Sequence, residues 1–207
     1  MAKISKIEAQ KKRRGRYNIF VDGKFEVGVS EKDLIEAGLS KDQEIAEDDL
    51  KKIKEKSNET KVKDKALKLL SLRPRSVLEL QKKLEEKNYD LRVIKKTIRW
   101  LKKEGFLNDK KFAKDWVSSR KNFHPMGKRR LSLELKKKQV PEKIVDKEIS
   151  KIKIKEEIKQ AKEIVKKRVK LYKDVEKYKK REKIIAFLSR RGYSWDVIKE
   201  VIEKLKL

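Results

Sequence analysis

The sequence contains a helical pattern that is repeated three times at a spacing of about fifty residues. Corresponding leucines stand at Leu84, Leu135 and Leu188, with offsets of 51 and 53 residues. In each copy the leucine is followed by a basic residue, then an apolar residue, then an apolar stripe with helical spacing. Units of this size bury enough apolar surface only by stacking on their neighbours. The repeat therefore predicts an array with a long surface, which favours binding to another macromolecule.

Each copy is predicted to form three helices. Ser76 with Glu79 has the spacing of a capping box, and Gly105 and Gly192 are typical of helix ends. Further helix starts are indicated by Asn108-Asp109, Pro141 and Ser194. The predicted helices span residues 62–72, 76–87 and 91–104, then 109–122, 128–138 and 142–151, then 155–172, 175–190 and 194–205.

Residues 16–29 predict a β-hairpin. Apolar residues alternate on both sides of Asp22-Gly23, a pair that suits the two central positions of a type I′ turn. A two-stranded hairpin is marginal alone, so we expect it to pack on a short helix that begins after Ser30 and ends near Gly38. Residues 1–15 carry Lys11, Lys12, Arg13 and Arg14 without an apolar stripe and predict a mobile basic arm.

A charged helical stretch over residues 47–68 is predicted to be interrupted near Ser57. The predicted fold is all-α, with tandem three-helix repeats in an elongated array and a small N-terminal β-hairpin. The predicted divisions are an arm at 1–15, the hairpin and charged helices at 16–60, and repeats at 61–108, 109–152 and 153–207.

The net charge indicates the class of partner. The chain has 62 Lys and Arg residues against 34 Asp and Glu residues, a formal net charge of +28. A field of this sign attracts polyanions and accelerates their encounter with the protein. An AT-rich genome or a hot habitat also enriches Lys and Glu, but neither explains so large an excess of cations. We therefore expect a nucleic acid or a nucleoprotein as the partner.

No group of residues predicts catalysis, a metal site or a cofactor site. The chain has no Cys, which excludes disulfides and thiolate chemistry. His124 is the only histidine and precedes Pro125, so a contact or loop-capping role is favoured over a metal ligand. Gly127-Lys128 lacks the other residues of a phosphate-binding P-loop. No apolar run has membrane-spanning length, and the start lacks a secretory apolar stretch, so we expect a cytoplasmic protein.

Basic residues recur at the ends of the second helix of each copy. Cations at a helix N-terminus oppose the helix dipole, so Arg73 and Arg75 are candidates for binding an external anion or an acidic side chain. The alternative is purely structural, because Pro74 and Ser76 also account for a helix junction. In the repeat register Tyr193 is predicted to pack inside its unit and Arg191 to point outward. The candidate contact residues are Arg73, Arg75, Lys128, Arg129, Arg130, Arg190 and Arg191.

Five segments of the sequence resemble the RecX family of recombination regulators. They are YNIFVDG at 17–23, ALKLLSLRPRS at 66–76, LKKEGFLND at 101–109, PMGKRRLSLEL at 125–135 and FLSRRGYS at 187–194. Their order and spacing agree with the family over nearly the whole chain. One departure is Gln139-Val140, where the family usually has a Lys-Gly-Ile-like end to the helix.

The resemblance implies a non-enzymatic regulator that binds in the groove of the RecA–DNA filament and spans neighbouring subunits. It implies restraint of the ATPase, strand-exchange and coprotease activities of RecA, although some relatives act positively and some contact DNA directly. Single- or double-stranded DNA is therefore a second expected partner, and we expect a monomer. The alternative is a helical-repeat protein that binds DNA or RNA independently of RecA. An enzyme such as a nuclease is disfavoured by the missing acidic or histidine metal site.

Overall fold

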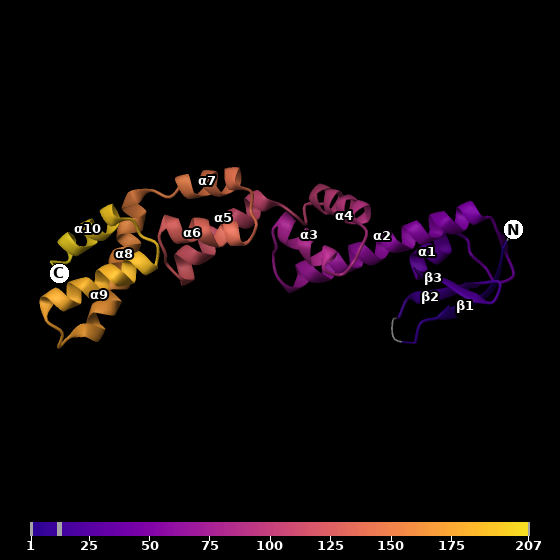
Figure 1. Cartoon of the computed structure of the whole chain (residues 1–207), viewed down its shortest axis with the longest axis horizontal. Coiled ribbons are helices and arrows are strands. Elements are labelled where there is room, and N and C mark those ends of the chain that lie inside the picture. The colour runs from indigo at the N-terminus through magenta and orange to yellow at the C-terminus, as the bar shows by residue number, and fades with distance from the viewer. Residues whose placement is uncertain (1, 12–13, 207) are drawn as a thin grey trace. The chain divides into compact units, whose positions relative to one another are not determined.

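The computed structural model describes residues 2–11 and 14–206. These residues form a mostly helical chain with a small N-terminal sheet (Figure 1). The chain divides into two compact units. The first unit comprises Met1–Arg73 and Gln81–Lys103, and the second comprises Pro74–Leu80 and Glu104–Leu207. Within the described residues, no helix is both long and apolar enough to cross a membrane.

The N-terminal sheet is antiparallel and contains the predicted hairpin. Its strands β1 (Ala2–Ala9), β2 (Arg16–Val21), β3 (Lys24–Ser30) and β4 (Glu44–Ile45) lie in the order β3-β2-β1-β4. Asp22 and Gly23 join β2 to β3 with φ angles of 48° and 79°, as a type I′ turn requires. Helix α1 (Glu31–Glu36) follows β3 and contacts β2 and β3. The hairpin and its packing on this helix are confirmed.

The predicted mobile arm is wrong for residues 2–9, which form β1. The strand contains an irregularity between Ile4 and Lys6, after which the pairing with β2 resumes. Ile4 and Ile7 therefore both contribute to the core beneath the sheet although they are three residues apart. A bulge of this kind breaks the alternation by which a strand is recognised in a sequence. Lys12 and Arg13 of the predicted arm lie outside the described residues.

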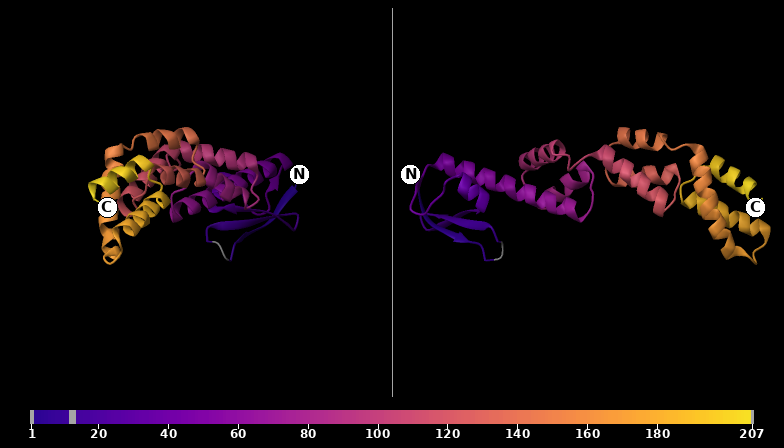
Figure 2. Two further views of the ribbon diagram at one scale, coloured as in Figure 1. Left: turned by 60° about the vertical axis from the view of Figure 1, so that its left-hand side comes forward. Right: turned by 180° about the vertical axis from the view of Figure 1, so that it is seen from behind.

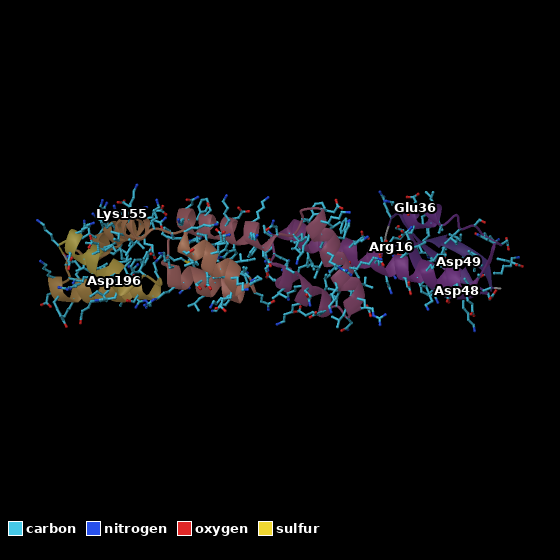
Figure 3. The ribbon with its side chains drawn as sticks, turned by 90° about the horizontal axis from the view of Figure 1, so that it is seen from above. Arg16, Glu36, Asp48, Asp49, Lys155 and Asp196 are labelled. Atoms are coloured by element: carbon cyan, nitrogen blue, oxygen red, sulfur yellow. The ribbon has the colours of Figure 1, made fainter. Side chains whose placement is uncertain are left out.

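Helix α2 (Glu47–Leu72) is continuous, so the predicted interruption near Ser57 is wrong. Ser57 is fully buried, and its hydroxyl donates a hydrogen bond to the Gly28 carbonyl of β3 at 2.5 Å. The side chain therefore bonds to the sheet and does not compete for the helix backbone. Arg16, labelled in Figure 3, also donates to the Gly28 carbonyl, at 2.9 Å, and reaches within 3.8 Å of Asp64 on α2. These contacts hold α2 against the sheet.

The repeats contain three helices each, close to the predicted ranges. The first repeat uses the C-terminal part of α2 together with α3 (Val77–Glu85) and α4 (Leu91–Lys103). The second contains α5 (Asp109–Phe123), α6 (Lys128–Lys137) and α7 (Glu142–Ser150). The third contains α8 (Ile154–Val169), the short 3₁₀ helix η1 (Lys170–Tyr172), α9 (Lys177–Arg190) and α10 (Trp195–Lys204). Figure 2 shows the helices of the second and third repeats as consecutive groups of the second unit.

Burial confirms the register of the repeats. Leu84, Leu135 and Leu188, which define the repeat in the sequence, are all fully buried. The second and third repeats each have a separate apolar core. Tyr193 belongs to the core of the third repeat and is only 2% exposed, which confirms its predicted inward position.

Each second helix also ends in the same way. A residue shortly after the helix adopts a left-handed conformation, with φ angles of 57° at Asn88, 59° at Gln139 and 80° at Gly192. The next N–H then returns to the helix, from Val140 to the Leu135 carbonyl and from Tyr193 to the Leu188 carbonyl. This is the Schellman end of a helix. Gln139, which departs from the usual glycine of the family, therefore ends α6 in the same conformation in which Gly192 ends α9.

Candidate functional site

The N-terminus of α3 is held by residues of the second repeat. Ser76 precedes α3, and its hydroxyl donates a hydrogen bond to the Lys138 carbonyl at the end of α6. The Val77 N–H, which has no partner within its own helix, donates to the Asp109 carboxylate at 2.8 Å. Because Asp109 begins α5, an acid from the next repeat caps the helix. We refer to these contacts as the first junction.

The same scheme recurs between the second and third repeats. The Gly127 N–H donates to the Arg191 carbonyl at the end of α9, at 3.0 Å. The Lys128 N–H donates to the carboxylate of Glu157 on α8, also at 3.0 Å. Glu157 is buried, and its carboxylate also lies 3.7 Å from the Lys128 ammonium. We refer to these contacts as the second junction.

Two glycines allow close backbone contact in the second junction. A Cβ placed on Gly127 would lie 2.2 Å from the Gly192 carbonyl oxygen, and one on Gly192 would lie 2.5 Å from the Arg130 nitrogen. Both distances are well inside van der Waals contact with the backbone, so a larger residue requires the repeats to separate. The sequence indicated only that Gly192 ends a helix, because the facing segment is more than sixty residues away.

Arg191 secures the second junction and does not point outward as predicted. Its guanidinium donates to the Pro125 carbonyl at 2.8 Å and lies 4.8 Å from the centre of the Phe187 ring. The side chain is half-buried. Tyr193 lies beside it in the sequence, and burial raises the pKa of its phenol. The Tyr193 hydroxyl is buried and has no hydrogen-bond partner within the described part of the chain.

One position gives the two junctions different electrostatics. Glu79 at the first junction corresponds to Arg130 at the second, with the repeat offset of 51 residues. The Glu79 carboxylate lies 3.7 Å from the guanidinium of Arg75 and 3.9 Å from the ammonium of Lys138. At the second junction the corresponding side chain is a cation. Arg130 is exposed, and its guanidinium donates to the Arg190 carbonyl at 3.2 Å.

Arg75, a candidate for contact with an external anion or an acidic side chain, is mostly buried. Only 9% of its side chain is exposed, and it is paired with Glu79. Its counterpart in the second repeat, Met126, is also buried, which shows that this position faces the interior in both repeats. Arg73 is half-buried. At the first junction, Glu79 therefore neutralises the cations of Arg75 and Lys138.

The second junction carries two adjoining hollows, both walled by Arg130 and Arg190. The larger, of about 430 Å³, is lined by Arg129, Arg130, Leu133, Glu134, Lys137, Ser189, Arg190 and Gly192. The smaller, of about 350 Å³, is lined by His124, Met126, Arg130, Phe187, Arg190 and Arg191. The one carboxylate among these residues, on Glu134, already accepts hydrogen bonds from Arg120 at 2.7 Å and Trp116 at 3.0 Å. Both hollows are therefore suited to anions.

Four family models match the chain along its length. They are the regulatory protein RecX N-terminal domain at residues 2–46 and the first, second and third three-helix domains of RecX at residues 63–101, 108–148 and 155–202. A regulatory protein RecX of Clostridioides difficile strain 630 is 33% identical over 205 residues, which cover 99% of this chain and 96% of that protein. The chain belongs to the RecX family.

Other RecX proteins give the same assignment. The RecX of Clostridium beijerinckii is 30% identical over 207 residues, covering 99% of this chain and 96% of that one. A crystal structure of regulatory protein RecX superposes with a TM-score of 0.73 at 28% identity and covers 98% of this chain and 100% of its own. A crystal structure of RecX from Lactobacillus salivarius superposes with a TM-score of 0.67 at 25% identity. It covers 72% of this chain and 97% of its own. The fold and the N-terminal sheet with three tandem three-helix domains are thus those of RecX proteins.

The structure brings together only some of the predicted contact residues. Arg129, Arg130, Arg190 and Arg191 line the two hollows of this RecX-family chain, whereas the Lys128 ammonium is paired with Glu157. Lys137 was missed, although it takes the place of Arg190 in the repeat register and was detectable there. Glu157 was missed because no local pattern reveals which acid caps a distant helix. We call Arg129, Arg130, Lys137, Arg190 and Arg191 the basic junction.

Proposed function

We propose that this protein binds the RecA–DNA filament and inhibits its ATPase, strand-exchange and coprotease activities. The observation that carries the proposal is the basic junction, which gathers cations from two repeats in a member of a regulatory family. A RecA–DNA filament presents a continuous row of phosphates together with protein surface. A chain with a net charge of +28 is attracted to such a target over its whole length, and the basic junction supplies a defined contact.

The residue types at the basic junction suit the binding of phosphate and carboxylate groups. The guanidinium of arginine presents donors in a rigid fork that matches phosphate and carboxylate oxygens. Arg129, Arg130 and Arg190 are exposed, so they reach a partner without first breaking a buried contact. Within the described residues there is no group of three side chains that would hold a metal ion. The proposal is regulation by contact with the filament.

The test is a RecA ATPase and strand-exchange assay on single-stranded DNA with increasing amounts of this protein. The proposal predicts that both activities fall at moderate salt, at concentrations too low to sequester the DNA. The control is binding to the same DNA without RecA at the same salt, because affinity that comes from phosphates alone falls steeply as salt rises. Unchanged RecA activities at saturating protein contradict the proposal.

A second candidate function is binding to DNA or RNA without RecA. It is favoured by the large net charge, which attracts any polyanion. Under this alternative, RecA activity falls only in proportion to the DNA that the protein removes, and excess competitor DNA restores it fully. Under the filament proposal, inhibition persists when competitor DNA is added after the filament has formed. We further propose that the protein acts as a cytoplasmic monomer, and light scattering of the purified protein tests the oligomeric state.

A further inference from the structure

We propose that the second junction binds one nucleotide of a single-stranded nucleic acid, with the phosphate in the larger hollow and the base in the smaller one. This inference rests on the nucleic-acid contact in the proposed function and deepens it. It assigns separate roles to the two hollows and identifies His124 as a residue that determines specificity. The two hollows have different linings and share two arginines, Arg130 and Arg190.

The larger hollow has the chemistry of a phosphate site. Arg129, Arg130, Lys137 and Arg190 present cations to it. Its carboxylate, Glu134, is held by Arg120 and by the indole N–H of Trp116, so it is not directed at a ligand. Gly192 lies at its edge, where its backbone packs against that of Arg130. A phosphodiester group satisfies these cations, which have no acidic partner lining the hollow other than Glu134.

The smaller hollow has the chemistry of a base site. It contains the His124 imidazole, the Phe187 ring and the Met126 thioether beside Arg130, Arg190 and Arg191. His124 is exposed, whereas Phe187 is half-buried beneath the Arg191 guanidinium at 4.8 Å. Aromatic side chains and arginine planes are the surfaces on which unstacked bases stack in single-strand binding proteins. Two aromatic rings beside the arginines are not needed for binding phosphates alone.

The arrangement of the two hollows favours a single strand over a duplex. Both are walled by Arg130 and Arg190, so they are close enough for the phosphate and the base of one nucleotide. In a duplex the faces of each base are covered by its neighbours, and exposing them costs unstacking and unpairing energy. A single strand presents both groups at little cost. Duplex DNA is expected to contact only the phosphate hollow.

The experiment measures binding by fluorescence anisotropy at moderate salt with three labelled DNA probes of about 15 nucleotides, a typical site size for such proteins. The probes are a single strand, a strand of the same length without bases, and a duplex. His124→Ala is expected to weaken binding of the base-bearing strand about tenfold, the magnitude typical of one lost stacking contact. Binding to the abasic strand and to the duplex is expected to stay within about twofold. His124→Phe, which keeps a stacking ring, is expected to restore binding of the base-bearing strand.

Phe25→Ala is the matched control, because it removes an exposed aromatic ring from the N-terminal sheet. It is expected to leave binding to all three probes unchanged. An equal loss on all three probes with His124→Ala, or no loss on any, overturns the base site while leaving the proposed function intact. Wild-type protein that binds none of the probes contradicts both the base site and the nucleic-acid contact of the proposed function, and RecA regulation is then judged by its own assay.

Discussion

The two junctions use the same backbone scheme with different side chains. At the first, Ser76 bonds to the end of α6 and Asp109 caps α3. At the second, Gly127 bonds to the end of α9 and Glu157 caps α6. The first junction needs a hydroxyl to reach its partner, whereas the second brings two backbones into direct contact. A serine and a glycine at the same position in the repeat therefore lead to two different packing distances.

The charges differ more than the backbones do. Glu79 lies between Arg75 and Lys138 and neutralises them, whereas its counterpart Arg130 adds a cation next to Arg190 and Arg191. The two repeats thus keep one packing scheme but differ at this position. In one repeat it holds an acid that pairs with neighbouring cations, and in the next it holds an exposed cation. The second junction is therefore expected to be the more sensitive to packing changes, because its backbones are in direct contact. Its exposed cations also make it the better candidate for contact with the filament.

The largest expected effect tests the close backbone contact. Gly192→Ala is expected to lower the free energy of unfolding by about 4 kcal/mol, combining left-handed strain with overpacking against Arg130. Gly105→Ala is the matched control, because Gly105 has a similar φ of 76° but nothing within 4 Å of the added Cβ. It is expected to cost about 1 kcal/mol. Equal losses of unfolding free energy for the two variants, measured by urea denaturation, would contradict this. They would show that the backbone at the second junction shifts to admit the added methyl group.

The next effect separates two neighbours in the third repeat. Tyr193→Ala is expected to cost about 3 kcal/mol, because it removes a buried ring and leaves a cavity. Arg191→Ala is expected to cost about 1 kcal/mol, since it removes a partly exposed hydrogen bond to Pro125. Thermal melts followed by circular dichroism give the ranking. A larger loss for Arg191→Ala would place the stability of this region in the junction and not in the core.

The two caps from the following repeats are predicted to differ in strength. Glu157→Ala is expected to cost about 2 kcal/mol, because a buried helix N–H and the Lys128 ammonium both lose their partner. Asp109→Ala is expected to cost about 1 kcal/mol, because Asp109 is less buried than Glu157. Chemical denaturation of both variants and of Glu157→Gln, which keeps an acceptor oxygen, measures the difference. If Glu157→Gln is as unstable as Glu157→Ala, the charge matters more than the cap.

The smallest effect is a gain in stability. Gln139 holds the left-handed position that Gly192 holds in the third repeat, with a φ of 59°. Gln139→Gly is expected to stabilise the protein by about 1 kcal/mol, because glycine adopts this conformation without steric cost. Gln139→Ala serves as the control and is expected to give no gain. Loss of stability in Gln139→Gly would indicate that the glutamine side chain makes contacts that outweigh the strain.

Local patterns were sufficient for part of the structure. The alternation around Asp22-Gly23 gave the hairpin, and the recurrence of Leu84, Leu135 and Leu188 gave the register of the repeats. Both depend on residues that are close in the sequence or on comparison between copies. Strand β1 was missed because its bulge interrupts the alternation of apolar residues. Its pairing with β2 and β4 is a tertiary contact that no pattern within β1 reveals.

The candidate site was predictable only in part. The clusters at residues 128–130 and 190–191 were visible as basic residues at helix ends, but their proximity depends on the packing of Gly127 against Gly192. The burial of Arg75 could not be predicted in this way, because it depends on how the position packs and on the pairing with Glu79 one helical turn away. Charge in a sequence therefore indicates where cations are abundant. Packing decides which of them remain exposed.

The central claim is that the basic junction contacts the filament, and Arg130→Glu tests it most directly. This change places at the second junction the acid that Glu79 supplies at the first, beside Arg191. Lys143→Glu, at an exposed position of α7 in the same repeat, makes the same change in net charge and is the matched control. The measurement is the protein concentration that halves the ATPase rate of a RecA–single-stranded-DNA filament at moderate salt, with unfolding curves recorded for both variants.

Arg130→Glu is expected to raise this concentration about tenfold, because a cation facing an anion is replaced by a charge that repels it. Lys143→Glu is expected to change it by less than about twofold, as a small change in long-range attraction. Both variants are expected to unfold within about 1 kcal/mol of the wild type, since exposed charges contribute little to stability. Equal inhibition by Arg130→Glu and the wild type, with both proteins folded, would contradict the assignment of the basic junction as the filament contact.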